Sequence, residues 1–498
     1  MTATPDPQRT EGRLRNAQRH EGVLQCVRHA TAPLPAGFRI TLDESTRRLS
    51  PTSWYGGSPA RIVRLTPAGR AAWTELANGP VTSAAAGVLA RRLTDAGLAH
   101  PEPPASTNAP DVTVVVPVHD RVDKLVPCLT AVARDGHPIV VVDDASRDPG
   151  AVARAARRFG ARLVVRPVNG GPAAARNTGI DASDTELVAF VDSDCVPPPG
   201  WIAALARHFA DPLVAAVAPR VVPVAPDSWA GRYTRATFGL DLGETPAAVA
   251  PGTRVAWAPT AALVLRRAAL AAVARDGDVL DPGLSVAGED VDLVWRLHEA
   301  GWRLRFDPTV HVRHLEPETW RGLLHRRFRY GTSAAPLALR HPGNVPPLVL
   351  FPWPAATVAA ALARRPALAA TAFAISVLTT RQAVRHTGQP DPGVTRVMAN
   401  AAYRTWLGVG RYGTQYALPV LAALAARRGH RTAVASLVVG PALAEWWRHR
   451  HTLDPARFVL GRLADDLAYG SGVWAGSVTH RTAAALLPSI RRRTHPRT

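Results

Sequence analysis

The chain has 498 residues, which is enough for two to four domains with cores of their own. Its net charge of +20 comes from arginine, because Lys124 is the single lysine, and a basic chain can bind nucleic acid, an anionic membrane or a phosphorylated substrate. We expect no nucleic-acid partner, since no zinc-finger spacing and no helix interleaving aromatic residues with arginine is found. Three widely spaced cysteines (Cys26, Cys128 and Cys195) argue for a reducing compartment and against a disulfide framework.

The N-terminal residues divide into a polar segment and a small α+β module. Residues 1–36 are rich in arginine and proline, lack the apolar stretch of a secretory signal, and are expected to be flexible and cytoplasmic. Residues 37–105 carry two alternating strand patterns, at 38–42 and 61–65, and two helices. Thr66 is expected to cap the first helix with Pro67 in its first turn, and residues 83–95 form the second. This pattern is typical of a winged-helix-like module, which could bind DNA, recognise a peptide or simply pack on its neighbour.

Residues 106–335 alternate between strands and helices, which predicts an α/β domain with a doubly wound parallel sheet. The expected strands are 112–118, 139–142, 161–166, 187–191 and 261–266, and the expected helices are 125–134, 151–159 and 291–300. The 187–191 strand, LVAFV, is apolar throughout, as expected of a strand buried on both faces. In such sheets ligands bind beyond the carboxyl ends of the strands.

Polar residues that suit a nucleotide diphosphate follow these strand ends. Two carboxylates one residue apart, Asp192 and Asp194, are hard ligands of the kind that bind Mg²⁺ or Mn²⁺. The turn at Gly171 would allow close approach of a phosphate to the following helix, which carries Arg176. The acid pair Glu289-Asp290 at a later helix start offers a general base.

The segments VVVPVHDR, VVVDDASRD, RPVNGGPAAARNTG, AFVDSDCVPPPGW and AGEDVDLVWRLHEAGWRLRFDP resemble the inverting family-2 glycosyltransferases with the GT-A fold. The resemblance implies a UDP-sugar donor, a metal ion (Mg²⁺ or Mn²⁺) and an acceptor hydroxyl. It implies a catalytic base at Asp290, with Glu289 touching the acceptor or the sugar. The implied nucleotide-sugar site comprises Pro117, Asp143, Asp144, Gly171, Arg176, Asn177, Asp192, Arg326 and Arg329, and the implied metal ligands are Asp192, Asp194 and His314, the last with a structural role as the alternative.

The whole chain is similar to one group within this family, the glycosyltransferases of the mycofactocin system. The segments LPAGFRITLDESTRRL, GGSPARIVRLTPAG and HRRFRYGTSAAPLALRHPG carry this resemblance. It implies transfer of glucose, by β-1,4 links, to a peptide-derived redox cofactor precursor, premycofactocin. The alternatives are a lipid or cell-envelope glycan acceptor, or a non-catalytic peptide-binding protein with a decayed domain. Residues 326–331 lack the Q-x-x-R-W motif of processive polysaccharide synthases, which argues against cellulose- or hyaluronan-type synthesis.

Residues 336–498 are rich in alanine and arginine and predict a helical region. Its apolar pieces are 346–363, 366–380, 416–426 and 432–443, and a bilayer requires about 20 apolar residues. The first piece is interrupted by Pro352 and Pro354, so buried, interfacial and short spanning helices all remain open. Because arginines flank each piece, we expect contact with the inner face of the cell membrane.

Overall fold

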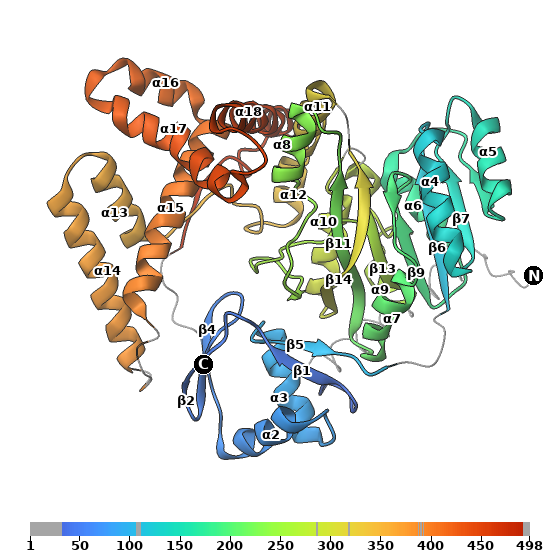
Figure 1. The fold of residues 1–498 in the computed structure, drawn as a ribbon, viewed down its shortest axis with the longest axis horizontal. Helices are drawn as coiled ribbons and strands as arrows, with labels where there is room; N and C mark the ends of the chain where they lie inside the picture. The colour runs from blue at the N-terminus through green and yellow to red at the C-terminus, as the bar shows by residue number, and fades with distance from the viewer. Residues whose placement is uncertain are drawn as a thin grey trace, which may run out of the picture.

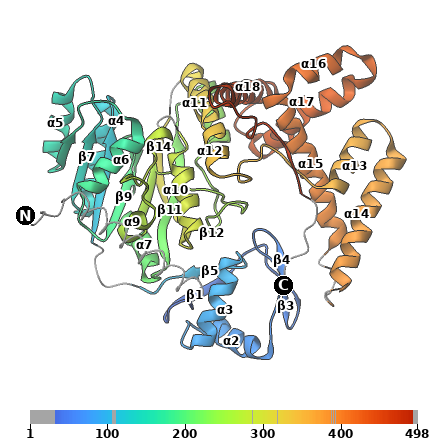
Figure 2. The ribbon, with the colours of Figure 1, turned by 180° about the vertical axis from the view of Figure 1, so that it is seen from behind.

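The structure is a computed structural model that describes residues 32–105, 111–284, 287–316, 319–386, 388, 391 and 393–491. Most of the predicted flexible segment, residues 1–31, lies outside these ranges, as do residues 106–110 at the start of the predicted α/β domain. Figure 1 shows three parts: an N-terminal module, a central sheet flanked by helices, and a group of C-terminal helices on the side of the central domain away from α5. The same arrangement is seen from behind in Figure 2.

The central sheet has the strand order β10-β14-β11-β13-β9-β6-β7-β8, with β12 paired to β14. The strands are β6 (Val112–Val118), β7 (Ile139–Asp143), β8 (Arg162–Val165), β9 (Leu187–Val191), β10 (Cys195–Val196), β11 (Val214–Val224), β12 (Ala247–Ala248), β13 (Ala262–Arg266) and β14 (Arg303–Leu315). β6 pairs in parallel with β7 and β9, and β7 pairs in parallel with β8. β13 runs antiparallel to β9 and β11, so the predicted parallel sheet is extended by antiparallel pairing and is mixed. A buried strand is apolar whichever way it runs, and its sequence therefore does not reveal its direction.

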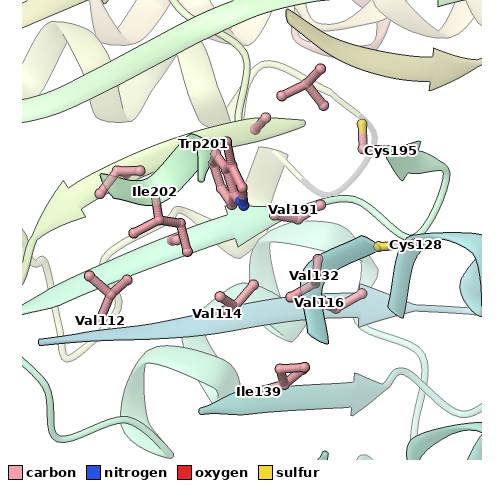
Figure 3. Packing of buried hydrophobic residues seen from close by; sticks show 14 of the residues in the cluster. Val112, Val114, Val116, Cys128, Val132, Ile139, Val191, Cys195, Trp201 and Ile202 are labelled. Carbon is pink, nitrogen blue, oxygen red and sulfur yellow. The ribbon is translucent and has the colours of Figure 1, made fainter. Parts of the chain in front are cut away.

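Helices cover both faces of this sheet. Alternate residues of β6 point to opposite faces: Val112, Val114 and Val116 belong to one core cluster, and Val115 belongs to the other. Figure 3 shows the first cluster, in which these valines lie with Val191 of β9 and Trp201 of α7. The helices on this face are α4 (Val122–Val132), α5 (Pro149–Arg158) and α7 (Trp201–Ala206), and those on the other are α6 (Gly171–Asp181), α9 (Arg267–Val273) and α10 (Glu289–Glu299).

The N-terminal module contains β1 (Arg39–Leu42), β2 (Arg47–Ser50), β3 (Ser53–Gly56), β4 (Arg61–Arg64), α2 (Pro67–Asn78), α3 (Ala84–Asp95) and β5 (Ala99–Glu102). β1 pairs with β5, and β2-β3-β4 form a separate antiparallel sheet. The predicted cap of α2 is confirmed, because the Thr66 side chain accepts from the Gly69 amide and Pro67 begins the helix. A buried ion pair fixes the module to the central domain: Arg91 of α3 donates to both carboxylate oxygens of Asp211, at 2.7 and 2.8 Å.

The remaining described chain is largely helical, and the prediction of a helical region over 336–498 is confirmed for its described residues. Its elements are α8 (Trp229–Thr237), α11 (Trp320–Thr332), α12 (Ala334–Arg340), α13 (Pro352–Leu362), α14 (Pro366–His386), α15 (Val394–Tyr416), α16 (Leu418–Ala426), α17 (Arg431–Trp446) and α18 (Pro455–Thr479), with a short pair β15 (Val349–Leu350) and β16 (Ser489–Ile490). Among the described residues, one helical stretch, Pro366–Arg385, is long and apolar enough to cross a membrane, and 17% of its apolar window is buried. This finding rests on length and composition alone. The three boundaries between the four segments drawn from the sequence stay predictions.

Candidate active site

A cavity of about 940 Å³ lies at the carboxyl ends of β6, β7 and β9. Its other walls come from α8, α10, α11, α12, α18 and the segment before β13. The predicted site residues that line it are Pro117, Asp144, Gly171, Arg176, Asp192, Asp194, Glu289, Asp290, His314, Arg326 and Arg329. The structure therefore gathers residues that are up to about two hundred positions apart in the chain into one cavity.

Two predicted nucleotide-binding residues, Asp143 and Asn177, are not among the residues that line the cavity. Asp143 is fully buried and accepts from the Ser146 amide, so it shapes the turn after β7. The Asn177 amide donates to the Leu280 carbonyl and accepts from the Leu280 amide, which holds the segment before α10. Both side chains therefore hold neighbouring segments in place and do not line the cavity themselves.

Asp144 does reach the cavity, and its carboxylate organises the glycine turn. Its two oxygens accept from the amides of Gly170 and Gly171, at 3.0 and 2.8 Å. Arg166 lies 2.8 Å from the same carboxylate. Gly171 has φ of +80°, a conformation that favours glycine. The start of α6 is thus held against the end of β7 in a fixed shape.

Arg176 links the two carboxylate groups that the sequence singled out. Its guanidinium donates to Asp192 at 2.5 Å and to Glu289 at 2.9 Å, and only 3% of Arg176 is exposed. Burial alone would lower the pKa of Arg176, but the charges of Asp192 and Glu289 raise it. Arg176 therefore acts in this structure as a buried cation that positions two cavity carboxylates.

Asp290 sits at the start of α10, where Gly288 turns the chain with φ of +95°. Its carboxylate accepts from the Val291 amide at 2.8 Å and opens into the cavity. A helix N-terminus favours the ionised form of a carboxylate. Desolvation outweighs this effect here and, reinforced by the charge of Glu289, raises the pKa of Asp290 to about 7. A carboxylate with this pKa can accept a proton near neutral pH and release it again.

Asp194 and His314 form the part of the cavity that could hold a metal ion. Asp194 Oδ1 lies 3.4 Å from His314 Nε2, and Glu316 Oε1 lies 2.7 Å from His314 Nδ1. A carboxylate on the far nitrogen of a histidine orients the ring for ligation. Glu316 is itself paired with Arg326, and these partners lower the pKa of Glu316 to about 2 although burial opposes the shift.

The donor atoms of Asp194, Cys195 and His314 all lie within 4.8 Å of one another. Carboxylate oxygen and imidazole nitrogen suit Mn²⁺ or Mg²⁺, whereas a thiol does not. Burial raises the pKa of the Cys195 thiol, which makes its neutral form the stable one. Asp194 and His314 thus fit the implied ion. Asp192 lines the same cavity but turns one oxygen to Arg176.

Several residues of the site were not predicted from the sequence. Glu316 stands two positions after His314, and the alternation of β14 could have revealed that both point the same way. Trp257 and Tyr469 also line the cavity. Neither residue belongs to one of the sequence motifs quoted above, and only the folded chain brings them to the site.

Residues 113–271 match the family model for glycosyl transferase family 2. Together with the mixed sheet and the cavity at its strand ends, this match defines a family-2 glycosyltransferase with the GT-A fold. Over 483 residues the chain is 38% identical to the pre-mycofactocin glycosyltransferase of Mycobacterium tuberculosis (strain ATCC 25618 / H37Rv), covering 92% of this chain and 99% of that one. The chain belongs to the pre-mycofactocin glycosyltransferase family.

More distant similarities cover parts of the chain. An N-acetylglucosaminyltransferase of Rhizobium meliloti (strain 1021) is 28% identical over 259 residues, which cover 49% of this chain and 61% of that one. Among solved structures, the mannosyltransferase PcManGT from Pyrobaculum calidifontis, in complex with GDP-Man and Mn²⁺, is 20% identical with a TM-score of 0.36. That similarity covers 69% of this chain and 88% of the other.

Proposed function

We propose that this glycosyltransferase moves glucose from UDP-glucose to premycofactocin, with inversion at the sugar's anomeric carbon. The observation that carries the proposal is that one cavity combines the Asp194–His314 pair with Asp290, a carboxylate whose pKa is about 7. The choice of premycofactocin is supported by the similarity along almost the whole chain. The choice of UDP and of glucose rests on the resemblance of the sequence motifs.

In this proposal Asp290 removes the proton of the attacking acceptor hydroxyl. Since the hydroxyl oxygen replaces the diphosphate in a single displacement, no covalent intermediate and no enzyme nucleophile are needed. A positioned base of this kind contributes about 10²–10⁴-fold to the rate. Arg176 holds Glu289 beside Asp290, and Asp144 keeps the α6 turn in place for the donor.

A divalent ion would be held by Asp194 and His314, with Asp192 close by in the same cavity. When bound, such an ion stabilises negative charge on a leaving diphosphate as a Lewis acid. Glu316 would keep His314 oriented for this role, because it occupies the far side of the ring.

The experiment that tests the proposal incubates the purified chain with a panel of nucleotide sugars, with and without premycofactocin. We expect UDP release from UDP-glucose that requires both the acceptor and a divalent ion. Transfer to a lipid-linked or glycan acceptor instead, with none to premycofactocin, would favour the alternative acceptor class. No turnover with any donor would contradict the proposal.

We also propose that the C-terminal helices rest on the inner face of the cell membrane. Residues 346–452 contain twelve arginines and two acidic residues, a formal charge of +10, which is half of the +20 of the whole chain. Large apolar side chains on these helices are exposed, among them Trp353, Leu368, Leu378, Val420 and Trp447. Arginine near an anionic leaflet contributes on the order of 1 kcal/mol each. Figures 1 and 2 show α13–α17 on one side of the molecule.

Flotation of the full chain with lipid vesicles tests this contact. We expect the protein to float with vesicles that contain phosphatidylglycerol and to float less with phosphatidylcholine alone or at high salt. If no protein floats with vesicles of any composition, the membrane proposal is contradicted. The proposed reaction is unaffected by that result.

A further inference from the structure

The last long helix, α18, forms part of the cavity wall. Tyr469 of α18 lines the cavity, although α18 follows the catalytic motifs by more than a hundred residues. The cavity lining also includes Val345, Leu337 and Trp257, all apolar or aromatic. These residues come from elements other than the ends of β6, β7 and β9 and helix α6, which carry the predicted donor residues apart from Arg326 and Arg329 of α11.

Glycines fix how α18 lies on α11. A Cβ atom at Gly331 of α11 would lie 2.2 Å from the Tyr469 carbonyl oxygen, and one at Gly472 of α18 would lie 2.0 Å from the Phe328 carbonyl oxygen. Gly476 is equally tight, with 2.4 Å to the Thr332 carbonyl oxygen. The two backbones are therefore in direct contact, as the neighbouring ribbons in Figure 1 suggest. No side chain can enter this seam, so α18 keeps its position along α11.

Charged groups hold the same contact. Asp465 of α18 lies 2.8 Å from Arg327 Nε of α11 and accepts from the Tyr233 hydroxyl at 3.0 Å. Arg327 itself lines the cavity. The hydroxyl of Tyr469 is hydrogen bonded to Tyr416 of α15, which leaves the ring as the part of Tyr469 that can contact a ligand.

Two arginines of this wall are neutralised by carboxylates of the protein. Arg326 pairs with Glu316, and Arg327 pairs with Asp465. The segment before β13, α12 and α18 also bring ring and aliphatic surface to the cavity: Trp257, Leu337 and the Tyr469 ring. Aromatic side chains stack on, or meet edge-on, rings that present an apolar face. This chemistry suits an aryl group or the apolar face of a sugar ring better than a charged group.

We propose that α18 is a wall of the acceptor subsite and that Tyr469 is a specificity-determining residue that packs on the apolar face of an uncharged ring of the acceptor. This proposal rests on the proposed function and adds the acceptor's chemical class. The ring has two possible sources, an aryl group of the acceptor itself or a sugar added in an earlier turnover. The C-terminal region would thereby select the acceptor while the strand ends bind the donor.

Calorimetric binding to the full chain tests the proposal without depending on turnover. The probes are 4-ethylphenol for the aryl source and methyl β-glucoside for the sugar source, each in the presence of UDP and Mn²⁺. The variants are Tyr469→Leu, which keeps bulk but removes the ring, Tyr469→Phe, which keeps the ring, and the control Leu460→Ala. Leu460 is on the same helix, is 59% exposed and does not line the cavity.

We expect wild type, Tyr469→Phe and Leu460→Ala to bind at least one probe alike, and Tyr469→Leu to bind it about tenfold more weakly. UDP affinity should not change in any variant. The proposal would be overturned if the wild type bound neither probe, or if Tyr469→Leu bound a probe as tightly as the wild type does. Failure of the proposed function would instead appear as absent sugar transfer by a protein that still binds a probe through Tyr469.

Discussion

The pH dependence of turnover gives the sharpest prediction about Asp290. The active form of a general base is the ionised form, and burial raises the pKa of Asp290 from 3.8 to about 7. With that pKa, about one tenth of the molecules carry the ionised base at pH 6 and about nine tenths at pH 8. Turnover at saturating substrate should therefore rise about tenfold between pH 6 and pH 8. Asp290→Asn should lower turnover at least about a hundredfold at pH 8 and remove this rise.

Stability measurements separate this role from a structural one. Between pH 4 and pH 7 Asp290 holds its proton in the folded protein, whereas the same residue has lost its proton in the unfolded chain. Because the folded state binds more protons in this window, the free energy of unfolding falls as the pH rises. Asp290→Asn removes that loss and should melt at a higher temperature than wild type at pH 8.

The matched control is Asp292→Asn on the same helix. Asp292 is buried against Arg296 and His341 and does not line the cavity. This variant should lose stability while its activity keeps the same pH midpoint. A wild-type profile that is flat from pH 6 to pH 8, or an Asp290→Asn variant that retains turnover, would refute the reasoning.

Asp194→Asn should abolish turnover and weaken Mn²⁺ binding measured by calorimetry, whereas full activity of the wild type in EDTA would exclude the proposed ion. Arg91→Met should cost about 3–5 kcal/mol of unfolding free energy, because it leaves the buried carboxylate of Asp211 without its partner; a change below about 1 kcal/mol in a urea titration would contradict this. Gly472→Ala should lower the melting temperature because its Cβ would meet a carbonyl of α11, whereas Gly429→Ala, with open space around it, should not. Similar melting curves for both glycine variants would argue against the seam.

Local signals in the sequence predicted much of the fold. The strand 187–191 agrees with β9, and Thr66 caps α2 as expected, because apolar runs and helix caps depend on neighbouring residues alone. The direction of β13 depends on which strands it joins, and its sequence contains no sign of that. α18 lies within the region predicted to be helical, but its bounds were not predicted, because glycines occupy much of its buried face and it lacks a clear apolar stripe.

Residues that belong to a recognised sequence motif were the easiest part of the cavity lining to predict. Residues whose place in the cavity depends on the direction of their side chain were the hardest. Asp143 and Asp144 are adjacent, yet only Asp144 lines the cavity, because Asp143 ends β7 fully buried against the Ser146 amide while Asp144 begins the turn after the strand. The raised pKa of Asp290 comes from burial, which a helix-start motif does not reveal. Tyr469 could not be assigned without the fold, because the α11–α18 contact alone brings it to the cavity.

The most direct test of the account is the anomeric configuration of the product, determined by NMR after incubation of the chain with UDP-α-glucose, Mn²⁺ and premycofactocin. A single displacement assisted by Asp290 predicts a β-glucoside, with one UDP released for each sugar transferred. An α-glucoside would contradict the single displacement, and UDP release without any glycoside would contradict the transfer itself.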